Sequence, residues 1–151
     1  MDALDKKAIS LLMTNGRATW AELGQAVGLS APSAAGRVRK LEEAKVITGY
    51  SALLDPAALG YPLTAFIFVT LANSRNRATF LRAITKMEQI SECHHIAGDD
   101  DYLLKVRCRT TADLDHLLAK ELKDKLGIAR TRTTVVLATA KESVQIPIDE
   151  G

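Results

Sequence analysis

The sequence predicts an α+β protein in which a winged helix-turn-helix domain is followed by a ferredoxin-like β-α-β-β-α-β domain. In the first third of the chain, apolar side chains recur at helical spacing, with a glycine turn between two short helices. From residue 62 onward, a strand-helix-strand pattern occurs twice. A turn-rich junction containing Asp55, Pro56 and Gly60 separates the two patterns. We therefore place the two domains at residues 1–60 and 61–151.

The first two helices have recognisable ends. Apolar residues recur from Leu4 to Leu12, and the Asn15-Gly16 pair supplies a stop signal. From Thr19 to Glu22 the chain has the form of a capping box, in which the hydroxyl and the carboxylate satisfy free backbone N–H groups reciprocally. A second, short helix is therefore expected to begin directly after Thr19.

The third helix is predicted to present a small, basic face to solvent. Gly28 permits a tight turn and Ser30 is placed to cap the helix. Three apolar residues recur at i, i+4 and i+7 and should face inward: Ala34, Val38 and Leu41. The outward face is then expected to carry Ser33, Gly36, Arg37 and Lys40, with Arg39 nearer the flank.

Such a face suits a recognition helix, because small side chains permit close approach to the groove while arginine and lysine reach phosphates or base edges. We predict that double-stranded DNA is contacted by Ser30, Ser33, Arg37, Arg39 and Lys40. The competing interpretation is a helical hairpin with a solvated basic face. The formal net charge of +2 is too small to decide between them.

The second domain is predicted from four candidate strands, at residues 62–71, 89–97, 102–109 and 129–140, the first of them almost continuously apolar. The two intervening helices are expected to be capped by Ser74 and by Thr110 with Asp113. A further short strand is predicted at residues 50–54, before the junction. Two successive β-α-β units give a four-stranded sheet with both helices on one face.

The other face of that sheet is also expected to be covered. Residues 65–69 and 135–138 are apolar at consecutive positions, so both faces of these strands are apolar. The simplest way to bury this second face is to pack it against the sheet of another subunit. The sequence thus predicts a homodimer.

Several classes of function are disfavoured. No run of 18 apolar residues or signal-peptide pattern occurs, so we expect a cytoplasmic protein without a membrane partner. Cys93 and Cys108 are expected to be reduced, small apolar residues. Adjacent strand residues alternate faces, so His94 and His95 do not easily serve one metal centre. No nucleophile with its orienting base is apparent, and we predict no enzyme activity, no cofactor and no metal.

The N-terminal motifs resemble those of the leucine-responsive and asparagine-operon regulators, the Lrp/AsnC family. The resemblance is carried by LDKKAI at residues 4–9, NGR at 15–17, ELG at 22–24, VGLS at 27–30 and RVRKLE at 37–42, and continues through VITGY at 46–50 and LDP at 54–56. Gly24 and Ala34 stand where the family more often has alanine and a larger apolar residue, so we expect looser helix packing there.

The resemblance implies a transcription regulator that senses an amino acid through its C-terminal domain. It further implies dimers that assemble into a higher oligomer such as an octamer, with ligand binding altering assembly or the position of the DNA-binding domains.

The candidate effector region is the turn GDDDY at residues 98–102, where three aspartates stand in succession. A glycine turn with exposed N–H groups beside an aspartate offers partners for both charges of an amino acid. Gly98, Asp101 and Tyr102 match a family signature, and TRTTVV at residues 131–136 resembles a strand that lines the effector region between dimers. We predict that the effector contacts His95, Gly98, Asp101, Tyr102, Thr134 and Val136. An ordinary polar turn and an ordinary strand remain the alternatives.

Two other functions are compatible with the sequence. The first is an architectural, nucleoid-type DNA-binding protein without a physiological effector, and the second is an amino-acid-binding subunit of a metabolic enzyme. Ligand-dependent thermal stabilisation tests the first, and an activity screen tests the second.

Overall fold

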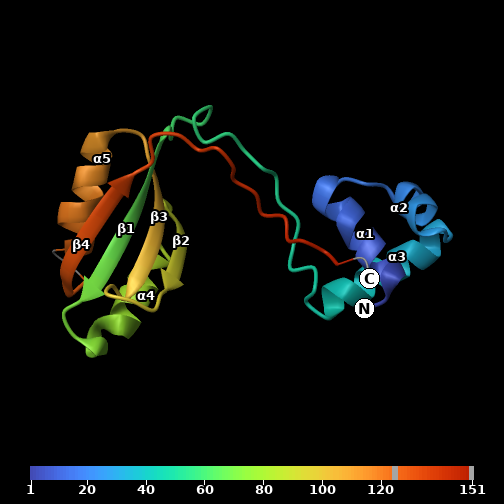
Figure 1. The fold of residues 1–151 in the computed structure, drawn as a ribbon, viewed down its shortest axis with the longest axis horizontal. Helices are drawn as coiled ribbons and strands as arrows, with labels where there is room; N and C mark the ends of the chain where they lie inside the picture. The colour runs from blue at the N-terminus through green and yellow to red at the C-terminus, as the bar shows by residue number, and fades with distance from the viewer. Residues whose placement is uncertain (124–125, 150–151) are drawn as a thin grey trace. The chain divides into compact units, whose positions relative to one another are not determined.

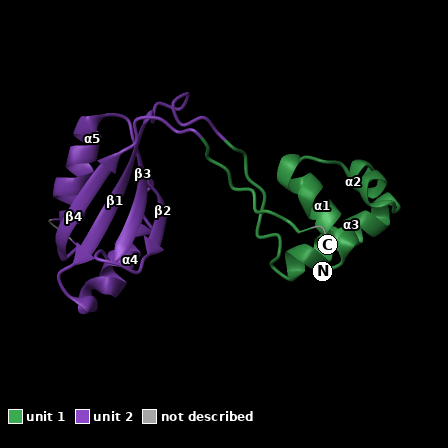
Figure 2. Cartoon of the chain, viewed as in Figure 1, with its two compact units in different colours: residues 1–53, 141–151 green, residues 54–140 purple. Residues whose placement is uncertain are grey.

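The computed structural model describes residues 1–123 and 126–149 and contains two compact units (Figures 1 and 2). The first unit comprises Met1–Leu53 together with the segment from Lys141 onward, and the second comprises Leu54–Ala140. Within the first unit, the Gln145 side chain donates a hydrogen bond of 3.3 Å to the carbonyl of Met13. This contact joins the C-terminal segment to the last turn of the first helix.

The first unit contains three helices, α1 (Ala3–Thr14), α2 (Trp20–Val27) and α3 (Ala31–Glu43). The predicted capping box of α2 is confirmed, with Thr19 and Glu22 bonding reciprocally at the helix start. A second box, which we did not predict, caps α1, where Asp2 and Asp5 exchange hydrogen bonds of 2.9 Å. Ser30 caps α3, as predicted.

The turn between α2 and α3 depends on two glycines. Gly28 ends α2 with a φ of 70°, which side-chain-bearing residues rarely adopt. Gly24 is buried, and a Cβ atom placed there would lie 2.6 Å from the carbonyl oxygen of Leu29. The expectation of looser packing at Gly24 is therefore wrong, because the missing side chain lets the turn approach the helix closely. The surrounding core consists of Ala8, Leu23, Val27, Ala34 and Val38.

The strand predicted at residues 50–54 is absent from the structure, so the helical unit has no β-wing there. A strand needs a neighbouring backbone to receive its N–H and C=O groups, and no described residue pairs with this segment. Instead, the Tyr50 hydroxyl donates to Glu42 of α3 at 2.9 Å. Burial and the Glu42 carboxylate raise the pKa of Tyr50 to about 12.

The second unit is the predicted four-stranded sheet with its helices. The strands are β1 (Leu63–Leu71), β2 (Ile90–His95), β3 (Tyr102–Cys108) and β4 (Ile128–Val135), in the antiparallel order β2-β3-β1-β4. The helices are η1 (Ser74–Asn76), α4 (Arg77–Ile84) and α5 (Thr111–His116), which continues as the π-helical segment Leu117–Lys123. Strand and helix order match the predicted ferredoxin-like arrangement.

One predicted cap is confirmed and the other is wrong. Thr110 caps α5 by accepting from the N–H of Asp113 at 3.1 Å, as predicted. Ser74, in contrast, lies inside the short 3-10 turn, and Asn73 caps it by accepting from the N–H of Arg75. The side-chain amide oxygen of Asn73 accepts this hydrogen bond, and asparagine is among the preferred N-cap residues.

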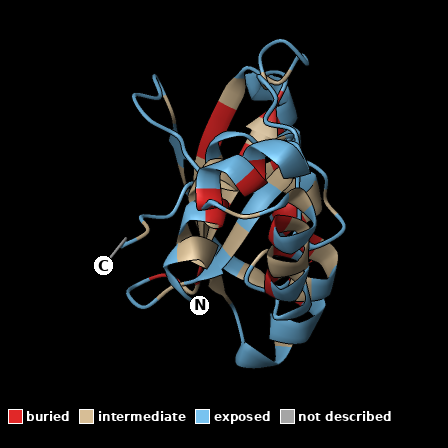
Figure 3. Ribbon diagram, turned by 90° about the vertical axis from the view of Figure 1, so that its right-hand side faces the viewer, coloured by how far each residue is buried: buried red, intermediate tan, exposed pale blue. Residues whose placement is uncertain are grey.

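Side chains alternate between the two faces of the sheet along β3 and most of β1. On the helix-covered face, Ile67, Val69 and Leu104 are fully buried and pack with Phe80 of α4 and Leu114 of α5. Figure 3 shows the buried segments on the strands and helices. The opposite face, called the open face below, carries Phe66, Phe68, Leu103, Lys105 and Arg107, which are only half-buried in one chain. Both faces of β1 are thus apolar, as the sequence predicts.

Candidate functional sites

The outward side of α3 is basic, and of the charged residues predicted to reach DNA only Arg37 is engaged, within the described residues, by another helix. Ser33, Arg39 and Lys40 are exposed. Within residues 1–123 and 126–149, neither Arg39 nor Lys40 forms an ion pair. Both are therefore available to phosphate groups.

Arg37 does not lie on this outward face, and that prediction is wrong. Its Nη1 lies 2.7 Å from a carboxylate oxygen of Asp2 and 2.8 Å from one of Asp5, both from the start of α1. The reason is helical geometry: position 37 follows Ala34 by three residues and precedes Leu41 by four, so it borders the buried stripe. The Asp5 N–H and the Arg37 guanidinium lower the pKa of Asp2, and the two carboxylates raise the pKa of Arg37.

The two serines at the start of α3 are partly occupied by each other. Ser30 accepts a hydrogen bond from the N–H of Ser33, and its hydroxyl lies 2.9 Å from the Ser33 hydroxyl. Ser33 is consequently a short side chain with one of its hydrogen-bonding directions already used. Both serines remain exposed at the helix start.

In the predicted effector turn, the middle aspartate is buried rather than crowded against its neighbours. The Asp100 carboxylate is 5% exposed and accepts from the Thr70 hydroxyl at 3.0 Å. It also accepts from Nη2 of Arg130 and Nη2 of Arg132, each at 3.2 Å. Burial raises the pKa of Asp100, but the hydrogen bonds of Thr70 and Arg132 and the two positive charges outweigh it, so the pKa lies below its usual value.

The remaining residues of the turn are fixed by the end of β1. The Asp101 carboxylate accepts from the N–H of Leu71 at 2.7 Å, and the Asp101 N–H donates to the carbonyl of Val69 at 2.9 Å. Gly98 has a φ of 148°, which favours glycine. Because Asp101 already holds the backbone, only part of its carboxylate remains for a ligand.

The predicted effector residues do not gather at one place within a single chain. His95 pairs with Tyr102 across β2 and β3 on the helix-covered side, with ring centroids 5.2 Å apart. Thr134 pairs with Phe66 and is exposed on the open face, and the N–H of Val136 bonds Thr64 beyond the end of β4. The Tyr102 hydroxyl is buried, and no described residue bonds it.

Three residues that sequence reasoning did not select stand beside the turn: Thr70, Arg130 and Arg132. The two arginines are two residues apart on β4 and so share one face of the strand. An i, i+2 pair of arginines in a predicted edge strand is the signal that could have identified them. Their common carboxylate partner, Asp100, is not apparent from the sequence.

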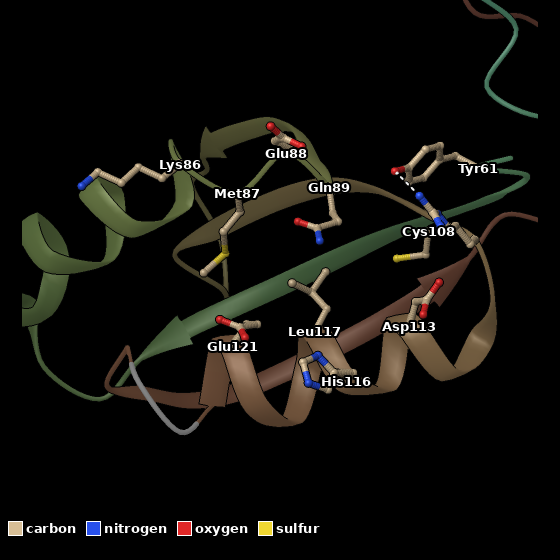
Figure 4. Close-up of a pocket in the computed structure, with 11 residues that line it drawn as sticks. Tyr61, Lys86, Met87, Glu88, Gln89, Cys108, Asp113, His116, Leu117 and Glu121 are labelled. Carbon is tan, nitrogen blue, oxygen red and sulfur yellow. Dashed lines mark hydrogen bonds between the residues drawn. The ribbon is translucent and has the colours of Figure 1, made fainter. Parts of the chain in front are cut away.

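A separate cavity of about 550 Å³ lies on the helix side of the sheet (Figure 4). Met87, Cys108 and Leu117 contribute apolar surface, and Arg109 and Tyr61 form a 3.4 Å hydrogen bond at one end. None of the six predicted effector residues lines this cavity. Burial raises the pKa of the Cys108 thiol, as does the charge of Asp113.

The described residues offer neither a metal-binding cluster nor a membrane-spanning helix. Among residues 1–123 and 126–149, no three histidine, cysteine, aspartate or glutamate side chains lie close enough to hold a metal ion. The Nε2 atom of His94 lies 3.2 Å from a carboxylate oxygen of Glu92. Within the described residues, His94 and His95 do not belong to a common metal-binding cluster. No helix in this part of the chain is long and apolar enough to cross a membrane.

Comparison with known protein families gives two matches that follow each other along the chain. Residues 1–42 match the AsnC-type helix-turn-helix domain, and residues 64–146 match the Lrp/AsnC ligand binding domain. The leucine-responsive regulatory protein of Haemophilus influenzae is 39% identical over 145 residues, which cover 95% of this chain and 87% of that protein. Its counterpart in Escherichia coli K12 is 38% identical over 154 residues, which cover 98% of this chain and 92% of that protein.

Solved structures give the same result. A transcriptional regulator of Neisseria meningitidis, crystallised as a complex with L-Met, has a TM-score of 0.93 and 29% identity, with 97% of this chain and 96% of that chain covered. AsnC of Escherichia coli has a TM-score of 0.87 and 27% identity, with 100% of this chain and 99% of that chain covered. A helix-turn-helix unit joined to a ferredoxin-like ligand-binding unit, with both family matches in order, shows that this chain is a DNA-binding transcription regulator of the Lrp/AsnC family.

Proposed function

We propose that this regulator responds to an amino acid, which binds the second unit and changes assembly or DNA binding. The observation that carries the proposal is the L-Met complex of the Neisseria regulator, whose fold matches 97% of this chain. The 98–102 turn supports it, because the turn is rigidly bonded to β1 and lies beside two partly exposed arginines. The proposal assigns the chain no catalytic role.

For DNA binding, we propose that Arg39 and Lys40 contact phosphates and that Ser30 and Ser33 stand nearest the bases. Their exposure at the start and outer side of α3 supports these roles. Arg37 serves chiefly to hold α3 against α1 through Asp2 and Asp5. Because its partner is DNA, we place the protein in the cytoplasm.

The assembly we propose is a homodimer formed through the open face, with dimers joining into a larger ring such as an octamer. Phe66 and Phe68 leave apolar surface on that face in a single chain. The effector residues we retain, His95, Gly98, Asp101, Tyr102, Thr134 and Val136, are split between the two faces of one sheet. A site that uses all of them therefore requires more than one subunit.

Two experiments test these proposals on the full chain. Thermal unfolding is measured with each of the twenty amino acids, and one ligand or a few related ones should raise the midpoint, because binding to the native state stabilises it. Absence of any shift, together with retained DNA binding, would favour an architectural DNA-binding protein. For assembly, Phe68→Asp should dissociate the oligomer in dilute sedimentation, whereas the exposed Thr79→Asp on α4 should not.

A further inference from the structure

The cluster of Asp100, Arg130 and Arg132 has more positive charge and more hydrogen-bond donors than its own contacts use. Two guanidinium groups share the carboxylate of Asp100, so these three side chains together carry a net charge of +1. Each arginine reaches Asp100 through Nη2 alone rather than through the two-pronged arrangement that guanidinium and carboxylate groups favour. The Nε and Nη1 groups of both arginines have no partner among the described residues.

The two arginines are also held in place, and both are exposed in a single chain. Their side chains are 60% and 59% exposed, whereas Asp100 between them is 5% exposed. The Arg132 guanidinium carbon lies over the Phe68 ring, 3.9 Å from its centroid, and this cation–π contact helps to hold the side chain in place. A buried carboxylate and an aromatic ring therefore orient the two cations in advance of any ligand.

The position on the sheet agrees with a ligand site. In the order β2-β3-β1-β4, β4 is an edge strand, so Arg130 and Arg132 lie at the margin of the open face that we propose to pair with a partner sheet. Thr134 follows Arg132 by two residues on the same face, about 7 Å along the strand. A small ligand bound by the arginines can thus extend toward the Thr134 hydroxyl.

We infer that Arg130 and Arg132 bind the carboxylate group of the small-molecule effector, with Asp100 as the positioning residue that holds both guanidiniums. The inference rests on the proposed function and makes it specific: the effector is a carboxylate, and an α-amino acid is held by its acid group at β4. Neither arginine belongs to the effector residues selected from the sequence.

The test uses the full chain and three related probes in calorimetry. L-Met is compared with 4-(methylthio)butanoate, which lacks the amino group, and with L-methioninamide, which lacks the carboxylate. We expect the amide to bind at least about tenfold more weakly than L-Met, because charge-assisted hydrogen bonds are lost. The substitutions R130Q and R132Q should each lower the affinity for L-Met by a similar factor, and R132K should lower it by less. The control R77Q, at an exposed position, should change this affinity by no more than twofold.

A measurement on the unmodified chain covers the case in which a variant does not fold. The Nε–H signals of Arg130 and Arg132 in a ¹H–¹⁵N spectrum should move on titration with propionate, and that of Arg77 should not. Unmoved signals, or L-Met binding that R130Q and R132Q leave unchanged, would overturn the site while leaving the amino-acid response intact.

The converse result separates the two proposals. If no amino acid binds but propionate moves both signals and R132Q abolishes the movement, the amino-acid response fails and the carboxylate site stands. If inorganic phosphate moves the signals and propionate does not, the assignment of a carboxylate ligand is wrong.

Discussion

At the scale of single residues, Gly24 is a position where the surrounding backbone leaves no room for a side chain. A Cβ atom at this position would lie 2.6 Å from a backbone oxygen and 3.2 Å from the nitrogen of Ala31. Backbone atoms cannot rotate away, so we expect Gly24→Ala to destabilise the helical unit by about 1–3 kcal/mol.

The matched control is Gly36, which lies inside α3 with open space around it. There the same substitution should stabilise by about 0.5–1 kcal/mol, because alanine favours helix over glycine. Urea unfolding of both variants measures the difference. Equal stability of the two variants would show that the close approach of the turn to Gly24 is unimportant.

Also at this scale, the basic residues of α3 should divide into two groups. Arg39→Ala and Lys40→Ala are expected to weaken DNA binding and to reduce the slope of affinity against salt, because each removes a phosphate contact. Arg37→Ala should lower the unfolding midpoint, because it leaves Asp2 and Asp5 unpaired. Titration of labelled duplex at several salt concentrations, beside thermal unfolding, checks both effects. A reduced salt slope for Arg37→Ala at unchanged stability would return Arg37 to the DNA-binding face.

At the scale of elements, Asp100 couples the 98–102 turn to β4, and this link should be sensitive to acid. Its pKa is lower in the folded chain than its ordinary value of 3.8. Its contribution to stability is therefore fully present above that pH and is lost as the pH falls through the folded pKa. Asp100→Asn should be less stable than the unmodified chain at pH 7, and the difference should shrink below pH 3.8.

The control for this prediction is Asp99→Asn, which changes an exposed carboxylate of the same turn. Urea unfolding between pH 7 and pH 3 gives the two curves. A difference between the unmodified chain and Asp100→Asn that stays constant over this range would mean that proton binding at Asp100 is not linked to folding.

The same elements show what sequence patterns can predict. The helices, the caps at Thr19, Ser30 and Thr110 and the order of strands and helices along the chain follow from local periodicity and capping chemistry. The three apolar positions of α3 define a buried stripe but do not show that position 37 borders it, so the apolar pattern alone does not predict the contacts of Arg37 with Asp2 and Asp5. The Asp100 cluster was missed because it joins residues 30 and more apart, and only the register of β1 with β4 brings them together.

At the scale of the whole molecule, the strand predicted at residues 50–54 marks a different limit. Its residues have the composition of a strand, but within the described residues no backbone group forms a hydrogen-bonded ladder with them. Composition can show that a segment is able to pair, whereas pairing itself depends on a partner. The open face of the sheet has the same property, since Phe66 and Phe68 predict a cover that a single chain does not supply.

Also for the whole molecule, sequence discrimination on DNA is expected to be modest. Base contacts in a helix-turn-helix concentrate at the start of the recognition helix. In α3 that start reads Ala31-Pro32-Ser33-Ala34-Ala35-Gly36, and Ser33 already bonds to Ser30. The long side chains of Arg39 and Lys40 come later, where phosphate contacts hold a protein on DNA without distinguishing bases.

The site should consequently be degenerate and tolerant of A·T pairs, with part of the preference coming from DNA shape. A bidentate arginine contact to guanine contributes roughly 1–3 kcal/mol, and the start of α3 offers no such residue. A larger assembly would also bend DNA across several sites and favour flexible steps that it never touches. Selection from random duplexes, followed by single-base substitution, measures this directly. A sharply defined motif, in which several positions each cost more than about 3 kcal/mol, would exceed the usual range for a mismatch and show that α3 reads bases in a way its side chains do not suggest.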